Sequence, residues 1–175
     1  MEVVIIRPSN IIGDSRTGEA DTNFGLYGFL KGLCVLKRRA SRTTGWQNPK
    51  YRIRLDVNVQ TNLVPVDYVA AVLVAALNHA HNRGIYHVSN PAPPTQELVI
   101  ECIKEVLEFP NLLTTPYDSD EPLSEDEKVF HSSMSIFKEY FTRTLHFPTE
   151  NTRGLLRKVD RSELMMDKAL LTKKA

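Results

Sequence analysis

Two pairs of side chains have residue types and spacing that could do chemistry. Tyr27 and Lys31 are four residues apart, so a helix would place them on one face, where a tyrosine proton donor can work beside a lysine. His79 and His81 are two residues apart near an expected helix end. Metal binding would need further converging ligands, so the two histidines are better interpreted as cations that complement the helix dipole.

Gly13, Asp14 and Ser15 follow a β-branched run and superficially resemble the nucleophile block of lipase-like esterases. That family places an aspartate three residues before its catalytic histidine, and no histidine of this sequence has an aspartate at that position. A serine without its base is usually a loop residue. We therefore interpret Ser15 as a loop residue and keep an esterase that uses Ser15 only as a third alternative.

Three glycines, Gly25, Gly28 and Gly32, imitate a dinucleotide-binding fingerprint. They follow no predicted strand, and their spacing is one residue too long for that fingerprint. We interpret them as glycines that allow a helix to pack closely.

Composition places the chain among ordinary globular proteins. It has 175 residues, of which 42% are hydrophobic and 25% charged, and its net charge is +1. This near-neutral charge gives no reason to expect a nucleic-acid partner. No membrane span is expected, because the longest apolar runs fall far short of the roughly 20 residues that cross a bilayer. Cys34 and Cys102 lack the spacing of a disulfide framework or zinc site, which favours a reducing, cytoplasmic setting.

The hydrophobic pattern predicts the strands and helices that would position the residues named above. It predicts strands over 3–6, 51–55 and 85–88, helices over 24–36, 66–79 and 95–107, an acidic loop over 109–126, and helices after it. The opening β-branched run is of the kind found in strands covered on both faces. Thr95 is a plausible helix N-cap, and Ser124 with Glu127 fits a capping box.

The two helices expected after the acidic loop have their own signals. The first would bury Phe130, Met134, Phe137 and Phe141, and the second, capped by Asp160 with Glu163, would run through Leu171. Strands alternating with helices and then helices alone predict an α/β fold with a C-terminal helical lobe, divided into residues 1–108 and 109–175. Three strands would form only an incomplete doubly wound sheet, so we expect an N-terminal half or another chain to cover it.

Four blocks of sequence, taken in order, resemble one family. Residues 4–18, 23–32, 62–70 and 85–89 resemble the late strand, the loops and the following strand of extended short-chain dehydrogenase/reductases, closest to the fatty-acyl and thioester reductase branch known as the male-sterility type. The resemblance implies the C-terminal part of a Rossmann-like reductase. In this family, hydride passes from NADPH to an acyl thioester and gives an aldehyde or alcohol.

The resemblance also implies roles for particular residues. Carried over by position, Pro8, Ser9, Asn10 and Ile11 would sit beside the nicotinamide end of the cofactor, at the carboxyl end of a strand. The substrate would be faced by three further residues, Asn23, Phe24 and Tyr27.

Two family features should precede the Arg7-Pro8 strand: the glycine-rich phosphate turn, and the catalytic tyrosine and lysine. We therefore assign no catalytic residue in this chain and expect weak or no NADP binding by the chain alone. The alternative is a non-catalytic interaction module, in which the open sheet pairs with another chain or with itself.

Replacing Tyr27 by phenylalanine tests the non-catalytic interpretation of the Tyr27 and Lys31 pair. The family places its proton donor before the Arg-Pro strand, so the Tyr27→Phe change should not abolish reductase activity measured as NADPH oxidation. Loss of an activity that the unaltered chain possesses would show instead that Tyr27 is the proton donor.

Overall fold

The computed structural model describes residues 3–22, 25–42 and 50–172, and the chain divides into two compact units. Unit 1 is formed by the segments 1–21, 62–94 and 145–175, and unit 2 by the segments 22–61 and 95–144. The boundaries of these units differ from the boundary predicted at residue 108. The division into 1–108 and 109–175 concerned functional parts of the chain, and it stays a prediction.

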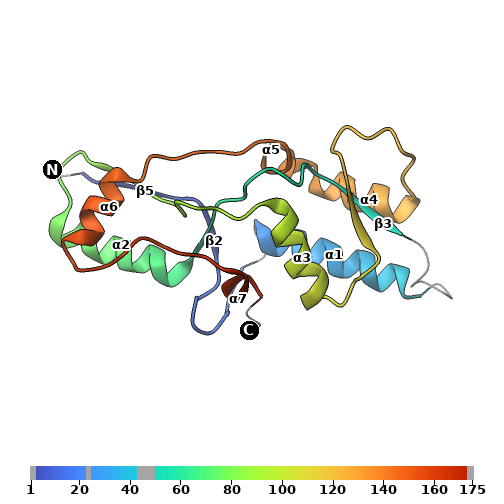
Figure 1. Cartoon of the computed structure of the whole chain (residues 1–175), viewed down its shortest axis with the longest axis horizontal. Helices are drawn as coiled ribbons and strands as arrows, with labels where there is room; N and C mark the ends of the chain where they lie inside the picture. The colour runs from blue at the N-terminus through green and yellow to red at the C-terminus, as the bar shows by residue number, and fades with distance from the viewer. Residues whose placement is uncertain (1–2, 23–24, 43–49, 173–175) are drawn as a thin grey trace. The chain divides into compact units, whose positions relative to one another are not determined.

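Unit 1 contains two pairs of short parallel strands. Strand β1 (Ile5–Pro8) pairs with β5 (Ile85–Val88), and β2 (Asn10–Ile12) pairs with β4 (Leu63–Pro65). Helix α2 (Val66–His79) follows β4 and leads toward β5 (Figure 1). Parallel strands joined through helices confirm the predicted α/β class.

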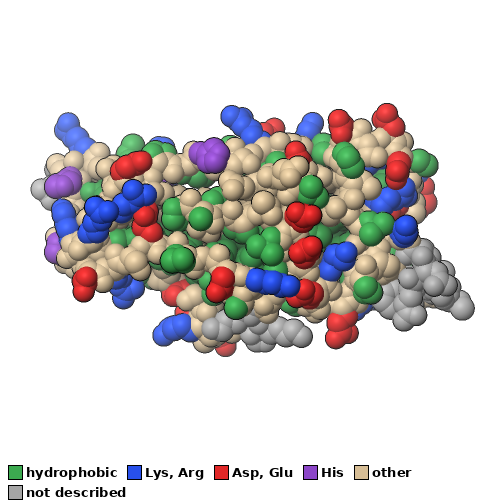
Figure 2. All heavy atoms as spheres, viewed as in Figure 1, with side chains coloured by type: hydrophobic (Ala, Val, Ile, Leu, Met, Phe, Trp, Pro, Cys, Tyr) green, Lys and Arg blue, Asp and Glu red, His purple; other side chains and the backbone are tan. Residues whose placement is uncertain are grey.

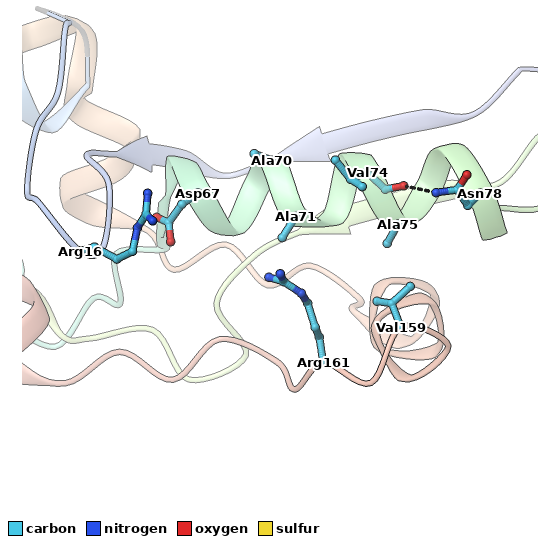
Figure 3. A pocket seen from close by; sticks show the side chains of 9 residues that line it. All are labelled: Arg16, Asp67, Ala70, Ala71, Val74, Ala75, Asn78, Val159 and Arg161. Carbon is cyan, nitrogen blue, oxygen red and sulfur yellow. Dashed lines mark hydrogen bonds between the residues drawn. The ribbon is translucent and has the colours of Figure 1, made fainter.

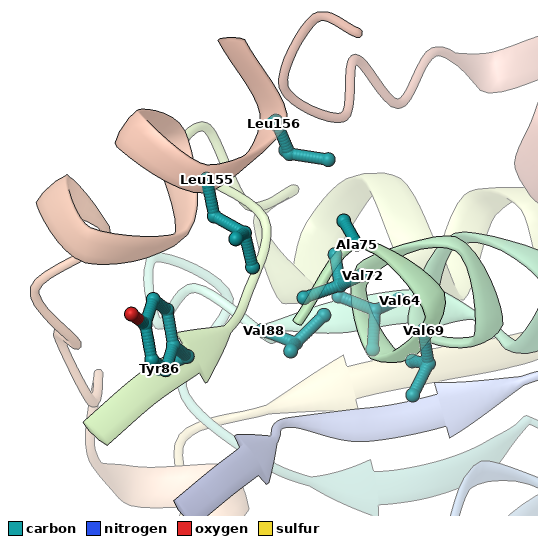
Figure 4. Close-up of a cluster of buried hydrophobic side chains, with 8 residues drawn as sticks. All are labelled: Val64, Val69, Val72, Ala75, Tyr86, Val88, Leu155 and Leu156. Atoms are coloured by element: carbon teal, nitrogen blue, oxygen red, sulfur yellow. The ribbon is translucent and has the colours of Figure 1, made fainter. Parts of the chain in front are cut away.

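The core of unit 1 lies between helix α2, strands β4 and β5, and helix α6 (Glu150–Arg157). Apolar residues of α2 recur at three- and four-residue spacing, which puts them on one buried face. The buried side chains drawn in Figure 4 are Val64, Val69, Val72, Ala75, Tyr86, Val88, Leu155 and Leu156. The sequence pattern predicted the bounds of α2 and β5, but it did not predict α6.

Strand β1 is open to solvent, although its β-branched sequence predicted cover on both faces. Val3, Val4 and Ile5 are 41%, 37% and 41% exposed. The predicted cover on both faces is therefore wrong for these residues. Strand β1 pairs with β5 along one edge, and no described strand pairs with its other edge. An open sheet edge agrees with the expected incomplete sheet.

Unit 2 is built around one further parallel strand pair. Its strands are β3 (Tyr51–Arg54) and β6 (Leu112–Thr115), and its helices are α1 (Leu26–Ala40), α3 (Gln96–Val106), α4 (Glu125–Met134), η1 (Ser135–Phe137) and α5 (Lys138–Thr142). Strand β3 alternates buried and half-buried residues, as predicted. Strand β6 lies inside the segment that was predicted to be a loop, so that part of the prediction was wrong.

Helix ends follow local side-chain chemistry at two predicted positions. The Thr95 hydroxyl accepts a hydrogen bond from the Leu98 N–H, and Ser124 with Glu127 forms a complete capping box. Phe137 lies beyond the end of α4, in η1, and is only half-buried.

The predicted helix capped by Asp160 and Glu163 is wrong. Asp160 has a φ of 51°, a left-handed conformation that follows the end of α6. The last described helix, α7 (Lys168–Leu171), is capped by Asp167 instead.

The packing role proposed for three glycines is confirmed for Gly32 but is wrong for Gly25, which precedes α1 with a φ of 56° and has no atom within 4 Å of an added Cβ. A Cβ at position 32 would lie 3.1 Å from Phe130 Cε2 and 3.3 Å from Met134 Cε, so these side chains of α4 would have to shift to accept it. The aromatic rings of Phe29 and Phe130 also meet edge to face, with centroids 5.8 Å apart.

Acidic and basic side chains are mixed over the face shown in Figure 2, as the near-zero net charge leads one to expect. Among the described residues, no helix combines the length and the apolar character that crossing a bilayer requires.

A buried carboxylate ties the acidic segment to the strands of unit 2. The Glu127 side chain is 1% exposed, and its Oε1 accepts hydrogen bonds from the Arg52 backbone N–H (2.6 Å) and from Arg52 Nε (3.1 Å). Its Oε2 accepts from Arg52 Nη2 (3.1 Å) and from the Ser124 backbone N–H (2.6 Å). Burial alone would raise the pKa of Glu127, but these hydrogen bonds outweigh it and hold the pKa below its usual value.

Changing Glu127 to glutamine should lower the free energy of unfolding by about 2 kcal/mol at neutral pH, because the guanidinium of Arg52 loses the buried one of its two carboxylate partners. A lowered folded pKa contributes stability that is present above the ordinary value of 4.5 and is lost as the pH falls through the folded value. Urea unfolding should therefore show that the difference between the two proteins shrinks below that pH.

Glu125→Gln is the matched control for this change. Glu125 pairs with Lys128 on the same helix, but its side chain is 87% exposed, so the change should cost at most about 0.5 kcal/mol. Equal losses in the two variants would contradict a special role for the buried carboxylate.

Candidate functional site

The chain of unit 1 changes its strand partner at Ser9. The Ser9 N–H donates to the Val88 carbonyl oxygen at the end of β5 (3.0 Å), while the Asn10 N–H donates to the Asn62 carbonyl oxygen just before β4 (3.3 Å). Ser9 therefore lies where one parallel pair ends and the other begins. In open α/β sheets, ligands bind outside the carboxyl ends of strands, at points where neighbouring connections diverge.

The side chain of Asn62 holds this junction together. Its Oδ1 accepts hydrogen bonds from Ser9 Oγ (2.8 Å) and from the Asn90 backbone N–H (2.8 Å). Its Nδ2 donates to the Asn90 carbonyl oxygen (3.0 Å). Because the Ser9 hydroxyl proton is engaged by Asn62, the remaining lone pairs of that hydroxyl are available as acceptors.

Asn90 adds an unpaired donor beside the junction. Its side chain is 2% exposed, and its Oδ1 accepts a hydrogen bond from the Ala92 N–H (3.0 Å). Its buried Nδ2 has no hydrogen-bond partner among the described residues. An unpaired buried donor costs about 1–3 kcal/mol, so an acceptor brought to this point would be bound favourably.

A tight loop follows the junction. Gly13 is required there because a Cβ would lie 2.5 Å from the Gly18 carbonyl oxygen. The Asp14 carboxylate accepts hydrogen bonds from the Arg16 side chain and backbone N–H and from the Thr17 N–H. These interactions, with the Arg16 side chain first, lower the pKa of Asp14 to about 2.

Ser15 anchors this loop to helix α2. Its backbone N–H and its hydroxyl both donate to the Asp67 carboxylate, at 2.8 and 2.7 Å. Asp67 lies in the first turn of α2, where a carboxylate also complements the helix dipole. The Ser15 hydroxyl is therefore bonded to an acid rather than to the histidine base that a serine nucleophile would need.

The structure brings together four of the site residues predicted from the sequence. Pro8 ends β1, Ser9 lies at the junction, and Asn10 and Ile11 open β2, with Ile11 42% exposed. Sequence reasoning missed Asn62 and Asn90 as members of this cluster. Asn62 does open one of the blocks that carry the family resemblance, which was the only sequence signal for it.

The residues predicted to face the substrate are described only in part. Tyr27 is half-buried on helix α1 of unit 2, one turn before Lys31. Asn23 and Phe24 lie outside the described residues. Among the residues that the structure describes, no three histidine, cysteine, aspartate or glutamate side chains gather as a metal site.

Comparison with known proteins agrees with this fold. Residues 1–73 match the model of the family described as male sterility protein. Among the curated proteins, none matches the sequence.

Similar solved structures include the terminal R domain from the myxalamid PKS-NRPS biosynthetic pathway, with a TM-score of 0.70 and 19% identity over 99% of this chain and 43% of that one. A thiolation-reductase di-domain from an archaeal non-ribosomal peptide synthetase has a TM-score of 0.64 and 14% identity over 99% of this chain and 35% of that one. RMD from Pseudomonas aeruginosa, solved with NADPH, has a TM-score of 0.52 and 16% identity over 98% of this chain and 46% of that one.

The present chain thus spans less than half the length of these solved proteins. At such low identities the likeness concerns the fold alone, which is Rossmann-like. This likeness in fold and the family match over the first 73 residues agree with the resemblance seen in the sequence.

Proposed function

We propose that this chain is the substrate-side segment of an NAD(P)H-dependent reductase of acyl thioesters. In this proposal a second segment supplies the glycine-rich phosphate turn and the proton donor, and the chain alone is inactive. The observation that carries the proposal is the change of strand partner at Ser9, which opens a polar junction where this fold class binds its ligands. A cytoplasmic location is part of the proposal.

The junction has groups suited to the nicotinamide end of NADPH. That end carries a carboxamide, which has both N–H donors and a carbonyl acceptor. The Ser9 hydroxyl, with its proton held by Asn62, offers an acceptor, and Asn90 Nδ2 is an unpaired donor. Pro8, Asn10 and Ile11 would complete the contact surface, and NADPH, when bound, would supply the hydride for the acyl carbonyl.

The acyl substrate is assigned to the segment that opens unit 2. Asn23, Phe24 and Tyr27 are proposed to face it, and the product would be an aldehyde or an alcohol. Two of the similar structures are reductase domains of peptide or polyketide synthetases, one of them joined to a thiolation domain. These neighbours support a thioester substrate that is held on a carrier.

The open edge of β1 supports the need for a second segment. Ile5 is 41% exposed, and the backbone groups along that edge can pair with another parallel strand. The same edge also supports the competing proposal of a non-catalytic module that pairs with another chain. The two proposals differ in whether assembly creates a nucleotide site.

Titrating NADPH with the protein, and following the fluorescence of NADPH, distinguishes the reductase segment from the non-catalytic module. We expect no saturable binding by the chain alone, and saturable binding when it is co-expressed with the nucleotide-binding half of a male sterility reductase. Ile5→Lys should prevent the assembly, because it places a charge on the pairing strand. Val129→Lys, at a position 47% exposed on α4, is the matched control and should have no effect.

Saturable binding of NADPH by the isolated chain would refute the division of labour between two segments. Assembly without nucleotide binding would favour the non-catalytic module.

Replacing Asn62 by alanine tests how much the junction depends on this side chain. The change leaves the Ser9 hydroxyl and two backbone groups of Asn90 without partners, so we expect unfolding in urea to become easier by about 2–3 kcal/mol. Ser9→Ala removes a single hydrogen bond and should cost about 1 kcal/mol. Asn58→Ala, at an exposed turn position, is the control and should change the stability least.

A further inference from the structure

A cavity of about 460 Å³ lies along helix α2 of unit 1, away from the Ser9 junction. It is an open groove whose side on the helix is made of small apolar side chains, among them Ala70, Ala71 and the exposed Val74. The segment after α6 contributes Val159 and Arg161 to the opposite side (Figure 3). The volume falls in the lower part of the range of about 300–1,000 Å³ that is usual for small-molecule sites.

The turn after α6 aims Arg161 at this cavity. Asp160 is in the left-handed conformation, and the Arg161 N–H donates to the Leu156 carbonyl oxygen (3.0 Å). These two features fix the backbone where it leaves α6. The Arg161 side chain consequently extends toward α2 and lies across from Ala71 (Figure 3).

Arg161 is the cationic group that the cavity leaves uncommitted. At one end of the cavity, Arg16 is paired with Asp14 (3.1 Å), and the Asp67 carboxylate is engaged by Ser15. The guanidinium of Arg161 has no hydrogen-bond or ion-pair partner among the described residues. One free guanidinium above an apolar floor matches a ligand with one negative charge and a short hydrocarbon body.

Charge also decides between a carboxylate and a phosphate. The Asp67 carboxylate lines the cavity at the Arg16 end, so a dianion would be repelled there more strongly than a single carboxylate placed on Arg161. From these observations we infer that the cavity binds a small aliphatic carboxylate, with its charged group on Arg161 and its chain on Ala70, Ala71 and Val74. The site is separate from the proposed cofactor junction and does not depend on the proposed function.

Titration of the ¹⁵N-labelled full chain with sodium hexanoate tests the inference by backbone amide shifts. We expect saturable shifts confined to residues 67–78 and 159–161. Arg161→Gln should weaken hexanoate binding about tenfold or more, the usual effect of losing a hydrogen bond to a charged group. Ala71→Leu should weaken it independently, because the larger side chain fills the floor.

Arg157→Gln is the matched control, since it removes the same charge from an exposed position on α6 outside the cavity lining. It should leave hexanoate binding unchanged, and neither hexylamine nor inorganic phosphate should produce the same saturable shifts. The inference is overturned if hexanoate gives no saturable shifts, if Arg157→Gln weakens binding as much as Arg161→Gln does, or if phosphate binds equally well.

Discussion

The amide of Asn62 is the contact on which the arrangement of unit 1 depends. One side chain bonds the hydroxyl of Ser9 and both backbone polar groups of Asn90, and so joins the end of β1 to the segment that follows β5. Its backbone carbonyl receives the first N–H of β2. Two separate strand pairs therefore meet at a defined point, and the polar groups that a ligand would contact are held there by the same residue.

Unit 2 uses a different device to fix its own long connection. The acidic segment before α4 would be solvated by its charges alone, yet Glu127 binds the backbone and the guanidinium of Arg52 on β3. Arg52 also bonds the carbonyl oxygen of Pro122 (2.7 Å) and the carboxylate of Glu121 (3.1 Å). One arginine thus fixes the part of this segment that leads into α4, which is how a polar connection can remain ordered.

Sequence reasoning succeeded where the cause of structure is local. Helix α2, strand β5 and the caps at Thr95 and Ser124 follow from spacing and hydrogen-bonding chemistry within a few residues. Strands β2, β4 and β6 have only three or four residues, which is too short for a recognisable alternation of apolar and polar residues. Their parallel partners are also distant along the chain.

The candidate site also combines a residue that the sequence could identify with a contact that it could not. Ser9 could be named from the resemblance, but its contact with Asn62, 53 residues away, is formed only by the tertiary fold.

The exposed edge of β1 has a consequence for the behaviour of the purified polypeptide. The edge of β1 that faces away from β5 pairs with no described strand, so a second copy can add a strand there. Such addition has no built-in stop, because two-stranded sheets leave new edges at each step. Aggregation should therefore increase as the protein concentration rises, and a lysine at this edge would act against it.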